Sequence, residues 1–318
     1  MFLTADTFDD LLRLVLKEIC SHGRSIEPKK GKASEVFGVL LELRNPRARL
    51  SRTESRGKIF SGLGELCWYL AGTNSLAFIE YYAKEYAKYA DGDVVYGGYG
   101  PRIFGAAQNN QVHRVLSLLR EHSVTRQAVI QIFDRVDLLE EHKDVPCTCT
   151  LQFAIRDECL HLLTNMRSND WFLGLPHDVF AFTMLQEMLA RALDIELGTY
   201  KHCVGSLHLY EVNEQAAQDF LSEGWQSTES PMPPMPAGDP WKGIDQLRRA
   251  EEKLRLNSAL TELDFDGVDP YWADLIRLLL VFHCKKNSDV HTMRQARKDM
   301  VSKIYDPFIE KIAVEMGS

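Results

Sequence analysis

The sequence predicts an α+β protein built on a single mixed β-sheet, and three observations lead to that fold class. Strand-like and helix-like segments interleave through the first 225 residues. Their spacings are too irregular for a doubly wound parallel sheet. A strongly apolar helix expected at 178–193 must be buried, which a layer of helices packed on one sheet provides.

The elements follow in order from apolar periodicity. Residues 7–20 predict a helix with Thr7 as its N-cap and acidic residues in its first turn. Two more helices are expected at 61–70 and 75–88, before the apolar helix. Apolar runs rich in β-formers predict strands at 36–43, 128–134, 148–155, 159–166 and 205–210.

The composition changes once, at the five prolines between Ser227 and Gly243. Proline fixes φ and removes a backbone donor, so this segment is expected to be extended. We therefore divide the chain into a main domain at 1–225, a Pro-rich linker at 226–243 and a helical C-terminal extension at 244–318. Helices are expected there at 244–257, 270–286 and 289–315, the last broken or kinked by Pro307.

Charge and cysteine usage exclude several classes of protein. The 37 basic and 45 acidic residues give a net charge of −8, so the surface as a whole repels nucleic acid and anionic lipid. No apolar run is long enough to span a membrane, and the first residues do not resemble a signal peptide. Seven cysteines without a framework spacing favour a reduced, cytoplasmic protein. From the negative charge and the lack of a long apolar run, we expect no nucleic-acid or membrane partner.

Cys147 is the first candidate for chemistry, because it follows Pro146 where a loop enters a strand. A partly exposed cysteine at a strand edge can act as a thiolate nucleophile. The alternatives are a buried small residue, or a zinc ligand together with Cys149, His202 and Cys203. Cys-x-Cys is tighter than the usual zinc spacing, so no metal site is expected.

Other polar residues are weak signals when taken singly. Arg167 offers a fork of donors suited to a phosphate, and Ser168 adds a hydroxyl. His208 and Tyr210 share one face of a strand, where they either bind sugar hydroxyls or are satisfied core residues. Asp178 alone is typical of a helix N-cap.

In chain order, however, these residues resemble the thymidylate synthase family. The resemblance covers about 20–215 and is most specific from Cys147 to Tyr210. It is carried by Glu65-Leu66-Cys67-Trp68, Gly72-Thr73-Asn74, Tyr96-Gly97, Pro146-Cys147, Arg167-Ser168-x-Asp170-x-x-Leu173-Gly174-x-Pro176 and Gly205-x-x-His208-x-Tyr210. In that family a cysteine adds to C6 of a pyrimidine nucleotide, and C5 then attacks the one-carbon unit of methylenetetrahydrofolate.

The resemblance implies catalytic roles for four residues and none for a metal. Cys147 falls on the nucleophile, and Glu65 falls on the glutamate that manages protons near C4 and C5. Tyr96 falls on a tyrosine that supports the associated water network. Asp178 stands where the thymidylate-forming enzymes carry asparagine.

It also implies binding roles. The nucleotide ligands are expected to be Arg167 and Ser168 at the phosphate, and His208 and Tyr210 at the sugar, with Trp68, Asp170 and Gly174 at the folate. Arg126 falls on an arginine that reaches the phosphate of the neighbouring subunit, which implies a homodimer. The second arginine of that pair is Gln127 here, and Arg24 or Lys30 are the candidates to replace its charge.

Asp178 points to cytosine as the base. The asparagine amide complements N3–H and O4 of uracil, whereas a carboxylate accepts from the C4 amino group of cytosine. Aspartate here resembles the cytidylate hydroxymethylases of the family. The alternative without a role in base recognition is that Asp178 only caps the helix.

Two further departures bear on the reaction. Thr148 replaces the histidine that usually follows the nucleophile, and the chain has no counterpart of the short apolar C-terminal tail that closes over the folate. A more open site suits attack by water instead of hydride.

We therefore expect a CMP or dCMP 5-hydroxymethyltransferase, with CMP favoured. A thymidylate synthase acting on dUMP, or a non-catalytic nucleotide-binding subunit, are the alternatives.

Overall fold

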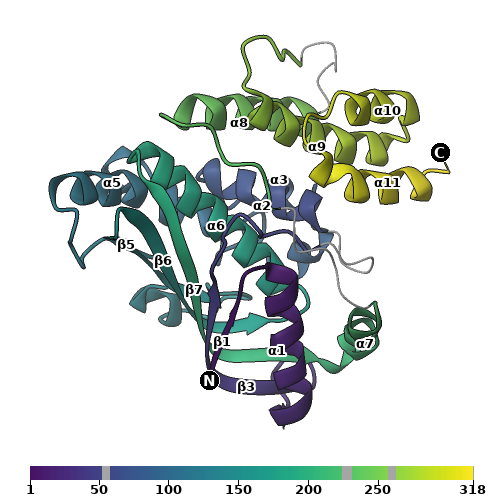
Figure 1. The fold of residues 1–318 in the computed structure, drawn as a ribbon. Coiled ribbons are helices and arrows are strands. Elements are labelled where there is room, and N and C mark those ends of the chain that lie inside the picture. The colour runs from purple at the N-terminus through teal and green to yellow at the C-terminus, as the bar shows by residue number, and fades with distance from the viewer. Residues whose placement is uncertain (52–57, 224–230, 257–262, 318) are drawn as a thin grey trace.

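The computed structural model describes residues 1–51, 58–223, 231–256 and 263–317. It contains one mixed sheet with helices packed against it (Figure 1), so the predicted α+β class is confirmed. The strands are β1 (Phe2–Ala5), β2 (Arg24–Ile26), β3 (Ala33–Leu43), β4 (Val129–Gln131), β5 (Thr148–Arg156), β6 (Cys159–Asp170) and β7 (Glu196–Tyr210).

The seven strands follow the order β1-β3-β7-β6-β5-β4, and β2 pairs with β3. The β1–β3 and β6–β7 pairs are parallel, and the other pairs are antiparallel. Parallel pairing of β6 with β7 sets Ser168 beside Ser206 and Asp170 beside His208. Two of the predicted binding segments therefore lie next to each other at one end of the sheet.

Helices cover one face of the sheet. The helices of the main body are α1 (Phe8–His22), α2 (Ile59–Leu70), α3 (Leu76–Ile79), α4 (Gly100–Phe104), α5 (Gln111–Glu121), α6 (Gly174–Ala192) and α7 (Glu214–Ser222). Thr7 caps α1, and its hydroxyl accepts from the backbone N–H of Asp10, as the sequence predicts. Helix α6 packs on β6 and β7 and is buried along nearly all of its length, which explains its apolar sequence.

The opposite face of the sheet is less covered. Along β6, Leu160 and Leu162 on the helix side are buried, whereas His161, Leu163 and Asn165 on the other side are only half-buried. This alternation marks a face that the helices leave partly exposed.

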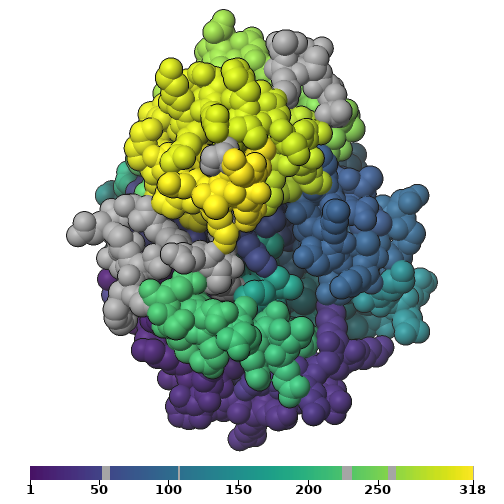
Figure 2. Space-filling view, turned by 90° about the vertical axis from the view of Figure 1, so that its right-hand side faces the viewer, coloured from purple at the N-terminus to yellow at the C-terminus, as the bar shows by residue number. Residues whose placement is uncertain are grey.

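The C-terminal helices are α8 (Trp241–Arg255), α9 (Pro270–Asn287), α10 (Val290–Lys298) and α11 (Asp306–Glu315). They cap one end of the molecule, and the N-terminal residues form the opposite end (Figure 2). Helices α8 and α9 pack on α2, and the ring of Phe282 stacks on those of Phe60 and Tyr82. These helices share one continuous apolar core with the sheet domain.

The described part of the Pro-rich segment is extended and packs closely on the main body. Met232 and Met235 are buried, and their backbone N–H groups donate to the carbonyl oxygen of Arg47 and to Oε1 of Glu187. The carboxylate of Glu187, on α6, also accepts from Arg47 and Arg49. One buried side chain thus fastens three separate segments of the chain.

Several boundaries differ from the sequence prediction. The helix expected at 75–88 is the short α3 followed by a 3₁₀ turn at Lys84–Lys88, because the chain becomes extended at Ala83. The strand β6 continues beyond its predicted end at residue 166, through Arg167 and Ser168 to Asp170. Pro307 lies in the first turn of α11, so it begins a helix and does not kink one.

Candidate active site

Cys147 lies in the loop that leads into β5, and Arg167 holds this loop in place. The guanidinium of Arg167 donates to the carbonyl oxygens of Pro146 (2.9 Å) and Val145 (2.8 Å), and its backbone N–H donates to that of Cys147. Gly97 allows a close approach from the other side, because a Cβ there would lie 2.8 Å from the carboxylate of Asp144. Cys147, the predicted nucleophile, and Arg167, the predicted phosphate ligand, are thus held together by direct hydrogen bonds.

The electrostatic surroundings keep the thiol of Cys147 protonated in the free protein. Burial raises its pKa to about 11, with Asp144 and Asp178 adding to the increase. Arg167 and Lys30 act in the opposite direction. Lys30 lies 3.8 Å from Asp144 and over the ring of Tyr89, so it belongs to the site. Arg24, the other candidate base of that loop, is exposed on β2.

Glu65 lies on α2 with its carboxylate buried. Oε1 accepts from the hydroxyls of Tyr69 and Tyr86, both at 2.6 Å, and Oε2 lies 3.1 Å from Nδ1 of His177. Burial alone would raise the pKa of Glu65, but His177 and the two hydroxyls outweigh it, so the pKa lies below its ordinary value. Glu65 is therefore an ionised carboxylate deep in the protein.

Asp178 is not the helix cap that it resembles. Helix α6 begins at Gly174, and Asp178 lies in its second turn with 7% of its surface exposed. Oδ2 accepts from the amide of Asn169 at 2.7 Å. A Cβ on Gly174 would lie 2.8 Å from that amide nitrogen, so only glycine leaves room for this contact.

A directional chain of hydrogen bonds fixes the amide of Asn169. Oδ1 of Asn169 lies 3.0 Å from Nε2 of His202, and Nδ1 of His202 lies 2.7 Å from the hydroxyl of Tyr200. Burial lowers the pKa of His202 to about 3, so the imidazole is neutral. Tyr200 then donates to His202, His202 donates to Asn169, and Asn169 presents a donor to Asp178.

The two buried carboxyl groups have opposite tendencies. Burial raises the pKa of Asp178 well above its ordinary value, and the negative charge of Glu65 adds to the effect. Asp178 therefore tends to hold a proton while Glu65 gives one up. Carboxyl groups whose surroundings separate their pKa values in this way are typical of acid–base sites.

Tyr96 and Trp68 do not lie where the resemblance implies. The hydroxyl of Tyr96 donates to Asp137 at 2.9 Å, so Glu65 has Tyr69 and Tyr86 as its tyrosine partners instead. Trp68 is 1% exposed, and its ring packs in the core against Tyr69 and Tyr86. Its assignment as a direct folate ligand is corrected accordingly, since a core residue has no surface to offer.

The predicted sugar and folate residues gather at the ends of β6 and β7. The rings of His208 and Tyr210 meet edge to face at 4.9 Å. Burial raises the pKa of Tyr210 to about 12, with further contributions from Asp170, Tyr89 and Cys147, which places this hydroxyl in the same site. Asp170 accepts from the backbone N–H groups of Phe172 and Leu173 and so orders the start of α6. Ser168 lies half-buried beside Ser206, whose hydroxyl donates to Glu35.

Arg126 lies away from this cluster. It is exposed, and its carbonyl oxygen accepts from the side chain of Gln152. Gln152 is five residues along β5 from Cys147, which corresponds to about 17 Å at the usual strand rise. The backbone of Arg126 is therefore placed well along the sheet from Cys147.

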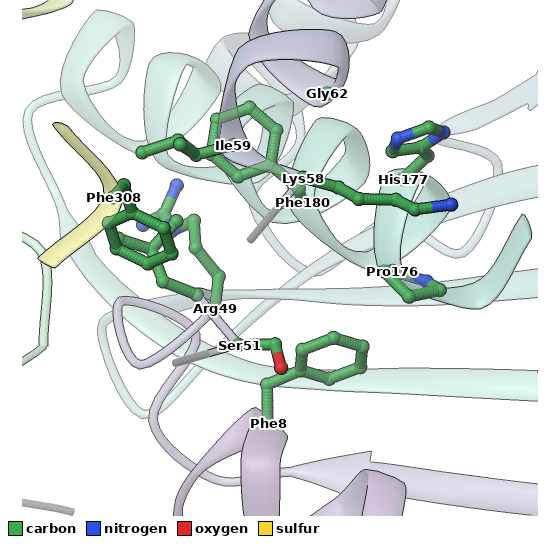
Figure 3. Close-up of a pocket in the computed structure, with 11 residues that line it drawn as sticks. Phe8, Arg49, Ser51, Lys58, Ile59, Gly62, Pro176, His177, Phe180 and Phe308 are labelled. Carbon is green, nitrogen blue, oxygen red and sulfur yellow. The ribbon is translucent and has the colours of Figure 1, made fainter. Parts of the chain in front are cut away.

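A pocket opens beside Glu65, at the start of α6 (Figure 3). Its walls come from α1, α2, α6 and α11, and the lining includes Phe8, Arg49, Ser51, Lys58, Ile59, Gly62, Pro176, His177, Phe180 and Phe308. Nε and Nη1 of the buried Arg49 have no hydrogen-bond partner among the described residues. Aromatic walls with nearby cations suit a flat, anionic ligand.

Sequence reasoning missed several of these residues, among them His177 and Asn169. His177 directly precedes Asp178, and its Nε2 lies 2.9 Å from the hydroxyl of Ser61, which is one helical turn before Glu65 on α2. Asn169 stands inside the Arg167–Asp170 motif. Each signal was present in the sequence, but only the fold shows what the side chains contact.

Within the described ranges, no group of three or more His, Cys, Asp or Glu side chains is arranged to hold a metal ion. Nor is any described helix long and apolar enough to cross a membrane.

A thiol with a raised pKa, an arginine beside it and two buried carboxyl groups with opposed pKa shifts form a candidate active site. The sequence profile of the thymidylate synthase family matches residues 10–255, and the chain belongs to that family. It is 30% identical over 216 residues to a deoxyuridylate hydroxymethyltransferase of Bacillus phage SP01, and 28% identical over 214 residues to one of Delftia phage PhiW-14. These alignments cover 63% of this chain and 55% and 59% of the phage proteins, so the chain spans less than two thirds of either relative.

Proposed function

We propose that the protein is a C5-hydroxymethyltransferase of pyrimidine nucleoside monophosphates with methylenetetrahydrofolate as its co-substrate. The observation that carries the proposal is the convergence of Cys147, Glu65 and Asp178 on one site. The names of the two phage relatives support the hydroxymethyl outcome.

The folate is proposed to bind against the pocket of Figure 3, which alone is too small to enclose it. Pro176, Phe180 and Phe308 offer apolar and aromatic walls, and Lys58 supplies positive charge beside them. When bound, methylenetetrahydrofolate supplies a one-carbon unit at the oxidation level of formaldehyde. Phe308 brings the C-terminal helices to this pocket, so they support its wall.

The residues of the chain have the following roles. Arg167, Ser168 and Lys30 bind the phosphate, and His208 and Tyr210 bind the ribose. The thiol of Cys147 adds to C6 after losing its proton in the nucleotide complex, since at a pKa of about 11 it is protonated in the free enzyme. Glu65 then manages the proton that leaves C5.

We propose that Asp178 reads cytosine. A neutral carboxyl group, which burial favours here, donates its proton to N3 and accepts from the C4 amino group. Asn169 donates to Oδ2 and fixes the orientation of the carboxyl group, with Oδ2 toward N3 and Oδ1 toward the C4 amino group in the proposed complex. CMP remains the favoured substrate of the cytidylate pair, with dCMP beside it.

Uridylate is the second candidate, and two observations favour it. Both phage relatives are named for deoxyuridylate. A neutral carboxyl group also complements uracil, because it can donate to O4 and accept from N3–H. Formation of thymidylate and a non-catalytic binding role are the remaining alternatives.

We also propose a homodimer in which Arg126 crosses to the phosphate of the partner. Arg126 is exposed, and its carbonyl oxygen accepts from Gln152, which lies five residues along β5 from Cys147. The half-buried face of the sheet, with Leu163 on β6, is the surface available for the contact. Sedimentation of an active monomer would remove this proposal.

The test is a single incubation with methylenetetrahydrofolate and CMP, dCMP, UMP and dUMP, followed by mass spectrometry. Gain of CH2O on one nucleotide identifies hydroxymethylation, the base and the sugar together. Gain of CH2 on dUMP, with dihydrofolate formed, would instead make the protein a thymidylate synthase. No product from any of the four nucleotides would favour the binding role.

A further inference from the structure

His177 occupies a singular position on α6. From Leu175 to Ala190 every residue of this helix is buried except His177, whose side chain is 16% exposed and lines the pocket of Figure 3. Its two ring nitrogens have different partners. Nδ1 lies 3.1 Å from Oε2 of Glu65, and Nε2 lies 2.9 Å from the hydroxyl of Ser61. The imidazole therefore connects a buried carboxylate to the wall of an open pocket.

Only one oxygen of the Glu65 carboxylate, Oε2, is available to accept a proton. Tyr69 and Tyr86 both donate to Oε1. Among the described residues, Oε2 accepts no hydrogen bond, and Nδ1 of His177 lies 3.1 Å from it. A proton taken up by Glu65 is thus received at Oε2, next to His177, and a buried carboxylate needs a route to pass that proton on.

Hydroxymethylation creates a proton to be moved. After the one-carbon unit is transferred and C5–H is lost, the nucleotide holds an exocyclic methylene on C5 and the sulfur of Cys147 on C6. Water then forms a bond from its oxygen to the methylene carbon and loses one proton. The electron pair of the methylene double bond moves into the ring and expels the thiolate from C6, which restores the C5–C6 double bond. No oxidant or reductant is needed.

We propose that His177 is the proton relay of this water step, a role that rests on the proposed function. Glu65 takes the proton of the attacking water at Oε2. In the nucleotide complex the imidazole is neutral with its proton on Nε2, where the hydroxyl of Ser61, which itself donates to the carbonyl oxygen of Lys58, accepts its hydrogen bond. The unprotonated Nδ1 accepts the proton from Oε2, and Nε2 releases its own proton to Ser61 and the pocket. His177 is a positioning and relay residue that acts through Glu65, and it favours addition of water over reduction of the methylene.

Two substitutions separate this relay from a structural role. His177→Phe keeps the ring size and removes both nitrogens, whereas His177→Gln keeps hydrogen-bonding groups toward Glu65 and Ser61 but cannot exchange a proton between two sites. His113→Phe is the matched control, since His113 is exposed on α5.

The first readout is uptake of deuterium at C5 of the nucleotide in D2O without folate, which reports reversible addition of Cys147. The second is the yield of hydroxymethyl nucleotide. Both variants should keep the exchange within about threefold of the wild type and lose hydroxymethylation by about 10²- to 10⁴-fold, the usual worth of a proton-transfer group. The control should match the wild type in both.

Chemical rescue gives the decisive comparison. Added imidazole should restore hydroxymethylation by His177→Ala at least about tenfold, since a diffusible base can replace a proton relay. The proposal is overturned if His177→Phe or His177→Gln forms product at the wild-type rate, or if both readouts fall together without rescue, which means a structural role. If the wild-type enzyme exchanges C5–H but yields no hydroxymethyl product, the proposed function fails and the relay fails with it. A relay that fails alone leaves the wild-type product intact.

Discussion

Replacing Asp178 by asparagine exchanges one carboxylate oxygen for an amide NH2 at nearly constant size. The bond from Asn169 survives, because the amide oxygen can still accept from its Nδ2, which lies 2.7 Å from Oδ2 in the native protein. The NH2 group of the variant must then face the base. Asn169 cannot rotate to accommodate a reversed amide, since His202 and Tyr200 fix its orientation.

The expected magnitude follows from this geometry. Toward cytosine, the new NH2 meets the C4 amino group, so two donors face each other in a buried site. An unsatisfied buried donor costs about 1–3 kcal/mol, or about 5- to 150-fold in kcat/KM at 1.4 kcal/mol per factor of ten. Toward uracil, the same NH2 donates to O4. We expect the ratio of cytidylate to uridylate turnover to fall by at least about tenfold.

The assay is a competition between CMP and UMP, and between dCMP and dUMP, with both products measured by mass spectrometry in the same tube. Asp170→Asn is the control, because it makes the same chemical change at a residue whose carboxylate accepts from the start of α6. It should leave the base ratio unchanged, whatever it does to the overall rate. A ratio for Asp178→Asn within threefold of the wild type would refute the reasoning.

Three further predictions concern the thiol, the buried ion pair and helix packing. The rate of alkylation of Cys147 in the free enzyme should be slow at pH 7.5 and rise toward pH 11. Asp144→Asn should move this profile to lower pH, because Asp144 raises the pKa of the thiol. An unchanged profile would contradict the electrostatic account. Glu187→Gln should cost about 3–5 kcal/mol in the free energy of unfolding, because it leaves buried arginine charge uncompensated. Burial opposes ionisation of Glu187, but its arginine partners lower its pKa in the folded protein. Its contribution to the free energy of unfolding is therefore present above the ordinary glutamate pKa of about 4.3 and disappears as the pH falls through the lower folded value. Denaturant titrations at several pH values will measure this loss. Gly64→Ala should lower stability by about 1–3 kcal/mol, because its Cβ would lie 2.2 Å from the ring of Tyr82. Gly62→Ala in the same helix meets only ordinary contacts and should be neutral or stabilising by up to about 1 kcal/mol. Thermal melts that rank the two variants alike would refute this.

Much of the fold follows from local periodicity, and the exceptions have physical causes. Helix α1 begins directly after Thr7, because a threonine hydroxyl can replace the missing backbone partners of a first turn. Strand β7 was predicted only at its end. Its earlier part carries Lys201 and His202, which break the apolar alternation and are tolerated because His202 is satisfied by Tyr200 and Asn169.

The site was predictable where a motif names a residue and was not where a contact is distant in sequence. Cys147, Arg167 and Asp178 follow from the family resemblance, whereas the pairing of Glu65 with His177 joins residues 112 positions apart. Trp68 shows the opposite error. A motif residue was assigned to the folate, but on α2 it points into the apolar core.

Helix α2 presents Glu65 to the proposed active site and Phe60 to the C-terminal helices. A rigid helix that contacts both regions couples structural changes in one region to the other. When a nucleotide tightens the contacts around Glu65, the amide protons of α9, where Phe282 stacks on Phe60, should exchange more slowly with solvent, although α9 lies behind the catalytic helix. The C-terminal helices would then respond to nucleotide binding at the proposed active site. A mutation in these helices would alter catalysis although the mutated residue contacts no substrate.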